Sequence, residues 1–210
     1  TWGRQNIHAG DEIIISGMEH HSNIVPWQIL CQEKNAVLKV IPVTDEGELS
    51  PDAYKYLLTN KTKLVAIMQV SNVLGTVNPV KAIVEEAHQA GARVLIDGAQ
   101  SAVHLDIDVQ DLDVDFLAFS GHKMLGPTGT GVFYGKYELL EKLSPFLVGG
   151  DTVEFSTYDS YKMLPVPEKF EAGLQDYAGI IGFGEACRYL QKIGFRKIRD
   201  HVNKLNKIII

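Results

Sequence analysis

The sequence has little of several features that mark specialised classes of protein. Its 210 residues include only two cysteines, Cys31 and Cys187, which argues against a disulfide framework. Twenty basic residues stand against 26 acidic ones, so the electrostatic footprint of a nucleic-acid or anionic-membrane partner is absent. No apolar run approaches the length that a bilayer requires, and no cleavable signal opens the chain. These absences predict a soluble, cytoplasmic protein with reduced thiols.

Apolar runs typical of buried strands alternate with helical patterns along most of the chain. Ser50 and Pro51 offer a helix N-cap and a first helical position, and Gly91 offers a helix stop. We predict strands at 11–16, 36–43, 63–70, 92–97, 113–120 and 129–136, and helices at 22–35, 51–59 and 80–90. A Pro-containing irregular region (145–175) and a helical tail follow. The alternation predicts a three-layer α/β fold whose mainly parallel sheet carries helices on both faces.

Four loops contain most of the reactive side chains. Ligands of open α/β sheets bind beyond the carboxyl ends of the strands, so the loops after residues 16, 70, 96 and 119 are the ones to examine. They contain the sequences "GMEHHSN", "SNVLGT", "DGAQS" and "SGHK". We therefore expect any functional site at this edge of the sheet.

Lys123 stands between an apolar strand and a glycine-rich loop. One interpretation is a loop lysine whose amine reaches solvent past the core. The other is a lysine that forms a Schiff base with an aldehyde, a role that partial burial favours because it disfavours the ammonium form. Position alone leaves both interpretations open.

Asp97 ends a buried strand, where a carboxylate is costly without a partner. It can cap the following turn, which is common. It can also hold a proton on the ring nitrogen of pyridoxal phosphate (PLP), which makes the ring an electron sink. A strand-end aspartate together with Lys123, which follows a strand of the same sheet, favours PLP more than either residue alone.

Two further groups of polar residues lie in the same loops. His20 and His21 are adjacent, but neighbours on an extended segment point to opposite sides, and no other ligand completes a metal site. One of the two imidazoles could instead lie flat on an aromatic cofactor. Ser120 and His122 could bind a phosphate together with the backbone of "GPTGTG", which lacks the Gly-Lys-Ser/Thr ending of a P-loop.

The segments "MEHHSNIVPW", "SNVLGTVNPV", "VLIDGAQSAVH" and "FLAFSGHKMLGPTGTGVFYG" together resemble the cysteine desulfurases of the SufS/CsdA type. These are class V aminotransferase-family enzymes with the PLP fold of type I. The resemblance covers nearly the whole chain. It implies that Lys123 carries PLP, that Asp97 is the partner of the pyridine nitrogen, and that His20 stacks on the ring.

The resemblance assigns roles to four more residues. Gln100 would hydrogen-bond the phenolic oxygen of the cofactor, Ser120 and His122 would bind its phosphate, and Asn72 would lie near the substrate carboxylate. The implied reaction converts L-cysteine to L-alanine and leaves a persulfide on the enzyme for iron–sulfur cluster assembly. It also implies a homodimer and a sulfur-acceptor protein as partners.

The chain departs from that family at several places. Neither Cys31 nor Cys187 lies in a loop like that of the family's nucleophile, and both are expected to be core or near-core thiols. Leu174 and Gln175 stand where many relatives have a threonine that reaches the cofactor phosphate of the partner subunit. We interpret the chain as truncated at both ends: residues 1–175 form a PLP-binding large domain, and 176–210 are helices leading toward a C-terminal domain that supplies the nucleophile.

Two alternatives to a cysteine desulfurase stay open. Another class V enzyme, such as a selenocysteine lyase, a kynureninase-like hydrolase or an aminotransferase, would keep the cofactor and change the chemistry. The piece could also be a non-catalytic domain, inactive alone, that binds PLP weakly or not at all.

Overall fold

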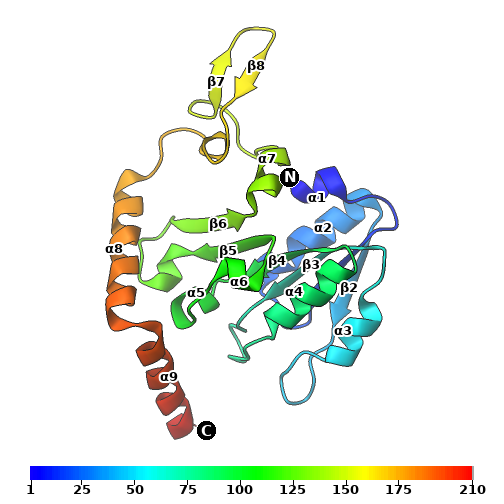
Figure 1. Ribbon diagram of the computed structural model, residues 1–210, viewed down its shortest axis with the longest axis vertical. Coiled ribbons are helices and arrows are strands. Elements are labelled where there is room, and N and C mark those ends of the chain that lie inside the picture. Colours follow the sequence, from blue (N-terminus) through cyan, green and yellow to red (C-terminus); the bar gives the residue numbers. More distant parts are fainter. Residues whose placement is uncertain (210) are drawn as a thin grey trace.

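The centre of the computed structural model, which describes residues 1–209, is a six-stranded sheet (Figure 1). Its strand order is β2-β1-β3-β4-β5-β6. Neighbouring strands are parallel except at one edge, where β6 pairs antiparallel with β5. The strands are β1 (Glu12–Ser16), β2 (Val37–Ile41), β3 (Thr62–Met68), β4 (Arg93–Asp97), β5 (Phe116–Ser120) and β6 (Gly131–Gly135). The mainly parallel sheet is therefore confirmed.

The sheet is covered on both faces because its strands are apolar on both sides. Ile14 and Val65 point into one buried cluster, whereas their neighbours Ile13, Ile15 and Leu64 point into another. Successive side chains of a strand point to opposite faces, so a continuous apolar run packs against a layer on each face of the sheet. These two clusters give the fold its three layers.

The residues that each helix contributes to these clusters show on which face of the sheet the helix packs. The helices α3 (Pro51–Leu57), α4 (Val80–Gln89) and α6 (Val109–Leu112) pack on one face, and α1 (Trp2–Asn6) and α2 (Val25–Lys34) pack on the other. Ser50 caps α3 by accepting a hydrogen bond from the Ala53 N–H at 3.2 Å, and Pro51 opens the helix. Gly91 follows the end of α4 with φ of 80°. These predicted helix signals are confirmed.

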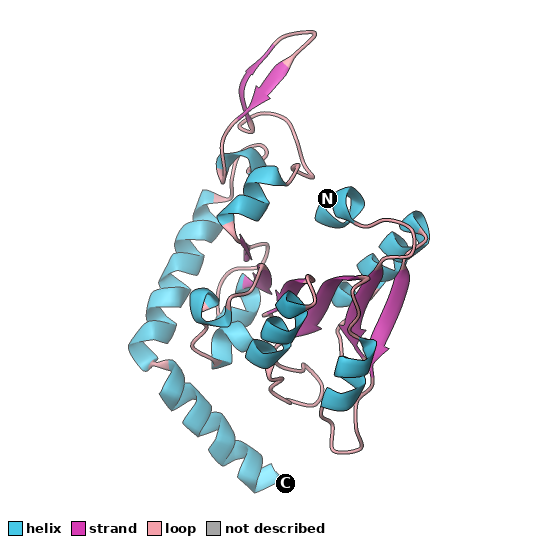
Figure 2. Cartoon of the chain, turned by 45° about the vertical axis from the view of Figure 1, so that its right-hand side comes forward, coloured by secondary structure: helices cyan, strands magenta, loops and turns pink. Residues whose placement is uncertain are grey.

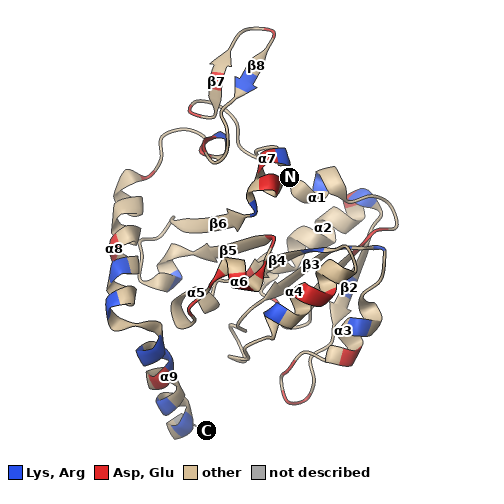
Figure 3. Ribbon diagram, in the orientation of Figure 1, with Lys and Arg blue, Asp and Glu red and all other residues tan. Residues whose placement is uncertain are grey.

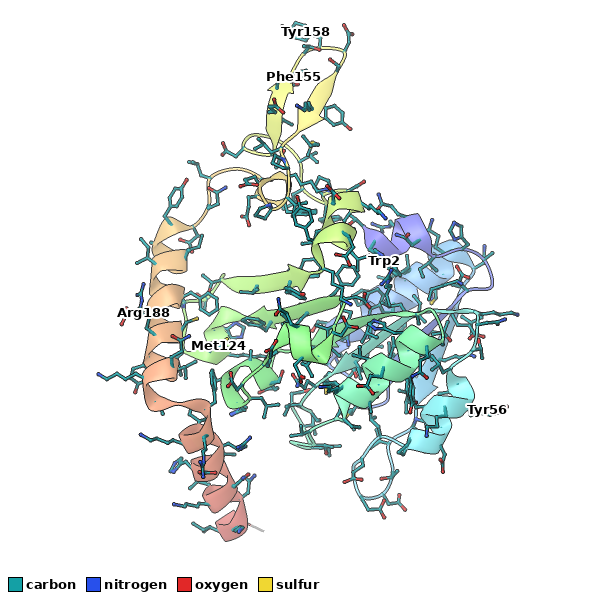
Figure 4. The ribbon with its side chains drawn as sticks, in the orientation of Figure 1. Trp2, Tyr56, Met124, Phe155, Tyr158 and Arg188 are labelled. Atoms are coloured by element: carbon teal, nitrogen blue, oxygen red, sulfur yellow. The ribbon has the colours of Figure 1, made fainter. Side chains whose placement is uncertain are left out.

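Two strands within residues 145–175 were missed by the sequence analysis, which predicts an irregular region there. The strands β7 (Val153–Ser156) and β8 (Tyr161–Met163) form a hairpin that projects from the body of the molecule (Figure 4). Phe155 and Tyr158 are exposed on it. Strands this short, with aromatic side chains in solvent, lack the alternation that identifies a half-buried strand.

The helical tail consists of α8 (Tyr177–Ile193) and α9 (Phe195–Ile209), which run along one side of the molecule (Figure 2). Leu190 of α8 packs in a buried cluster with Met124 and Ala102, and Ile198 of α9 lies against the same cluster. Lysine and arginine side chains gather on α9 (Figure 3). The tail is thus attached to the sheet close to the turn that contains Lys123.

A charged network closes the opposite end of the sheet. The side chain of Asp115 is 0% exposed, and its carboxylate accepts hydrogen bonds from Arg93 Nη1 at 2.9 Å and from the backbone N–H of Val94 at 2.8 Å. His88 Nε2 lies 2.8 Å from the same carboxylate. This network joins the amino ends of β4 and β5, and it is remote from the loops that follow the strands.

Among residues 1–209, no helix is both long enough and apolar enough to cross a membrane.

Candidate active site

The turn that carries Lys123 follows β5 directly. It is a short 3₁₀ helix, η2 (Gly121–Met124), and Leu125 closes it in the left-handed region with φ of 64°. Met124 anchors the turn in the cluster below α8 (Figure 4). Lys123 is half-buried, and no hydrogen bond or ion pair within residues 1–209 engages its amine. The turn therefore fixes the backbone of Lys123, and its amine has no partner among the described residues.

Asp97 is the last residue of β4, the strand beside β5. One oxygen of its half-buried carboxylate accepts a hydrogen bond from the Ala99 N–H at 2.9 Å. Register pairing places Asp97 opposite Ala118 of β5 and Met68 of β3. The capping role predicted as one alternative is therefore present, and it leaves the second carboxylate oxygen available to a ligand.

His20 precedes a second 3₁₀ turn, η1 (His21–Asn23), after β1. Its Nδ1 accepts a hydrogen bond from the Ser22 N–H at 3.2 Å and lies 2.6 Å from Ser22 Oγ. Neutral His20 consequently carries its proton on Nε2. Its ring is tilted by 45° from that of His21. No group of three His, Cys, Asp or Glu side chains within residues 1–209 could hold a metal ion.

Six of the seven predicted site residues line one cavity of about 320 Å³. They come from the last residues of β4 and β5 and from the segments that follow β1, β3, β4 and β5, and they are His20, Asn72, Asp97, Gln100, Ser120 and Lys123. The seventh, His122, is exposed and does not belong to the lining. The volume lies within the range of roughly 300–1,000 Å³ that is usual for cofactor sites.

The chemistry of this cavity fits PLP. Within residues 1–209, the side chains of Asn72, Gln100 and Ser120 make no hydrogen bond, as is true of the Lys123 amine. A primary amine for an aldehyde, a carboxylate for a ring nitrogen and hydroxyl and amide donors for oxygen atoms thus share one cavity. These are the groups that the sequence analysis assigns to the cofactor.

Two larger cavities of about 580 and 910 Å³ do not have this character. The first, between α1, α2 and the sheet, is lined mainly by aromatic and aliphatic side chains, and its charged pair Arg4–Glu33 is joined by a hydrogen bond of 2.9 Å. The second lies at the base of the hairpin; its lining includes Lys169, whose amine donates to the Glu141 carbonyl oxygen at 2.9 Å, unlike the amine of Lys123. Chemistry rather than volume therefore identifies the site.

Sequence comparison decides the family. The family model described as aminotransferase class-V matches residues 1–210. The chain belongs to this family. The predicted resemblance is confirmed at this level, and class-V proteins are PLP-dependent.

Two curated relatives of this class-V chain are cysteine desulfurases by name. The probable cysteine desulfurase of Staphylococcus epidermidis is 53% identical over 208 residues, which are 99% of this chain and 50% of that protein. The cysteine desulfurase of Synechococcus elongatus is 50% identical over 205 residues, which are 98% of this chain and 33% of that protein. The class-V chain thus spans one third to one half of the length of these relatives.

Solved structures confirm the fold class. The cysteine desulfurase CsdA from Escherichia coli matches with a TM-score of 0.90 and 42% identity, over 93% of this chain and 49% of that one. The apo cysteine desulfurase from Thermococcus onnurineus NA1 matches with a TM-score of 0.94 and 39% identity, over 98% of this chain and 51% of that one. A C-DES variant with glycine covalently linked to its PLP cofactor matches with a TM-score of 0.83 and 26% identity, over 93% of this chain and 53% of that one.

The two cysteines of this class-V chain lie outside the cavity lining. Cys31 is buried in the cluster beneath α2, and burial raises the pKa of its thiol, which disfavours the reactive thiolate. Cys187 is half-buried on α8 and packs against the cluster of Met124. The prediction that both are core or near-core thiols is confirmed.

The segment that departs from the family pattern is at the surface. Leu174 is 87% exposed. Gln175 accepts a hydrogen bond from the Tyr177 hydroxyl at 3.1 Å.

Three residues in or next to the cavity wall were missed by the sequence analysis. Glu19 and Asn23 are buried, and Asn23 and Trp27 belong to the cavity lining. The signal was available, because Glu19 stands beside His20 in "MEHHSN" and an acidic residue following a buried strand needs a partner.

Gly121→Ala is expected to destabilise the chain by about 1–3 kcal/mol and to weaken cofactor attachment, because the added methyl group overpacks the turn. It would overlap Thr130 Oγ1 and lie 3.2 Å from the Phe183 ring. Urea unfolding and PLP labelling of Lys123 measure the two effects. Gly184→Ala is the matched control, since nothing lies within 4 Å of its added methyl group. An unchanged unfolding midpoint in Gly121→Ala would contradict this reading of the turn.

Proposed function

We propose that this chain is the cofactor-binding part of a PLP-dependent cysteine desulfurase, with PLP attached at Lys123. One observation carries the proposal: Lys123 and Asp97 meet four other polar side chains, from four separate loops, in one cavity. The names of the relatives and the PLP dependence of the family support it.

Each residue of the cavity has a role in this proposal. When bound, PLP withdraws electrons from an amino acid attached to it. Asp97 would hold a proton on the ring nitrogen, and His20 would supply a flat wall for the ring. Lys123 would hold the cofactor through its amine and, once the substrate amine has taken that place, would move a proton at the substrate α-carbon.

The remaining polar groups orient the cofactor and the substrate. Gln100 would donate to the phenolic oxygen, and Ser120 would donate to the phosphate. Asn72 would bind the carboxylate of the amino acid. His122 would contribute to the phosphate site only after its exposed side chain turns toward the cavity.

The substrate that we propose is L-cysteine, which would yield L-alanine and an enzyme persulfide for iron–sulfur cluster assembly. Attack on the substrate sulfur needs a thiolate, and neither Cys31 nor Cys187 belongs to the cavity lining. We therefore place the nucleophile in another part of the full-length protein, beyond a cofactor domain of residues 1–175 and connecting helices at 176–210. A homodimer and a sulfur-acceptor protein belong to the same proposal.

Reductive labelling tests the proposal directly. The purified chain is incubated with PLP and reduced with borohydride, and the added pyridoxyl mass is located by peptide mass spectrometry. We expect a single specific adduct on the peptide that contains Lys123. Absence of the adduct in a sample shown to be folded would mean that the chain alone is a scaffold without a working cofactor site.

A further inference from the structure

Glu19 is a buried carboxyl group to which the proposed reaction gives no role. It is 7% exposed and lies directly before His20. Its Oε1 accepts hydrogen bonds from the Ser16 hydroxyl and from the backbone N–H of Met68, the latter at 2.9 Å. Its Oε2 accepts a hydrogen bond from Asn23 Nδ2 at 2.7 Å. No cation within residues 1–209 pairs with Glu19, so its burial depends on these donors.

The hydrogen bonds continue from Glu19 to the cavity. Asn23 is also buried, and its Oδ1 accepts a hydrogen bond from Trp27 Nε1 at 2.9 Å. An indole N–H can only donate, so the amide of Asn23 must turn its oxygen to Trp27 and its NH₂ group to Glu19. The polarity of the whole chain of bonds is therefore fixed, and position 19 must offer acceptors to both Asn23 and Met68.

Trp27 is a shared wall of two cavities. Together with Pro26 and Leu95, it lines both the polar cavity of about 320 Å³ and the apolar cavity of about 580 Å³. The indole is therefore part of the boundary between the two cavities, and its orientation shapes the wall of the polar cavity on this side.

Glu19 is also attached to the strand that neighbours Asp97. Met68, whose N–H binds Glu19, is the last residue of β3 and pairs in register with Asp97. Burial is the main cause that raises the pKa of Glu19, and the charge of Asp97 raises it further, while the three hydrogen bonds oppose both. A neutral carboxyl group could donate to Ser16 and still accept from Met68 and Asn23. The acceptor pattern therefore holds in either protonation state.

We propose that Glu19 is a positioning residue of this site: through Asn23 it fixes Trp27 as the wall of the cavity, and it fixes the segment of His20 against the end of β3. The inference rests on the proposed cofactor role of the cavity. Glu19 acts through other residues and touches no reacting atom.

Exchanging the donor and the acceptor of the hydrogen bond between positions 19 and 23 tests this role. Glu19→Gln places an NH₂ group against a donor in either orientation of the new amide, and Asn23→Asp places two carboxyl groups face to face. In the double variant, the new amide at position 19 donates to one oxygen of the new carboxylate at position 23. The other oxygen of that carboxylate accepts from Trp27, so every bond is restored. The formal charge of the double variant equals that of the original chain. Glu48→Gln, at an exposed position, is the control for the same chemical change.

Two measurements follow the exchange. The chain has two tryptophans, so Trp27 is the sole one in a Trp2→Phe background. Acrylamide quenching of its fluorescence then measures how accessible the Trp27 indole is in the cofactor-free protein. The second measurement is the dissociation constant of PLP. We expect each single variant to increase quenching and to weaken PLP binding about tenfold, as an unpaired buried polar group predicts. We expect the double variant to recover both values.

The outcomes separate the two proposals. Single variants with unchanged quenching, or a double variant that recovers nothing, would overturn the role of Glu19. Failure of the original chain to bind PLP would contradict the proposed function, and the quenching of the cofactor-free protein would still decide the role of Glu19. If Glu19→Gln alone does not fold, recovery of folded protein in the double variant is the rescue that the proposal requires.

Discussion

Lys123→Ala is expected to abolish the specific pyridoxyl adduct completely. A Schiff base requires an unprotonated primary amine at the aldehyde, and Lys123 is the lysine that lines the cavity with Asp97. Lys123→Arg should abolish the adduct equally, because a guanidinium keeps the positive charge and does not form this bond. Peptide mass spectrometry after borohydride reduction measures both variants.

The chain offers a matched control for this experiment. Lys61 is exposed and immediately precedes β3, at the end of the sheet opposite to the cavity. Lys61→Ala should leave the adduct at Lys123 unchanged. An adduct of equal yield that persists in Lys123→Ala and lies on another lysine would show that labelling is non-specific, and the cofactor role of the cavity would be lost with it.

Asp115→Ala is expected to lower the free energy of unfolding by about 3–5 kcal/mol, because it leaves buried donors and a cation without their partner. The side chain of Asp115 is 0% exposed and binds Arg93, His88 and the backbone of Val94. Urea unfolding followed by far-UV circular dichroism measures the change. Asp115→Asn, which keeps the shape of the side chain, should cost less.

An exposed ion pair provides the comparison for Asp115. Asp111 pairs with Lys81 at 2.6 Å, and both side chains are more than half exposed. Asp111→Ala should cost less than about 1 kcal/mol, because solvent screens such pairs. Equal losses in the two variants would mean that burial of the Asp115 network contributes nothing to its strength.

The sheet was predictable because its strands are buried on both faces. Residues 63–70 form an almost continuous apolar run, which is typical of a strand covered on both faces, and the structure places β3 at Thr62–Met68 in the middle of the sheet. The hairpin was not predictable on this basis. Phe155 and Tyr158 are exposed there, so no burial pattern distinguishes its strands from an irregular loop.

The meeting of the site residues at one edge of the sheet could be predicted from the direction of the strands. The hydrogen bonds of Glu19, Asn23 and Trp27 could not. Asp97 ends one strand and Lys123 follows its parallel neighbour, and such strands bring their carboxyl ends to one edge. The bonds from Glu19 to Asn23 and from Asn23 to Trp27 depend on the orientation of side chains around a 3₁₀ turn. Periodicity in the sequence does not determine such orientations, so these roles required coordinates.

The strand order bears on how the protein is made. Of the six strands, β1 and β2 leave the ribosome before the other four, and these two strands are neighbours at one end of the sheet. The strand β3 then joins the free edge of β1, and each later strand, from β4 to β6, joins the edge left by the strand before it. The sheet can therefore grow in the direction of synthesis without opening an earlier pairing. Lys123 follows β5, the last of the parallel strands, so the pairing of β5 with β4 is what places it beside Asp97.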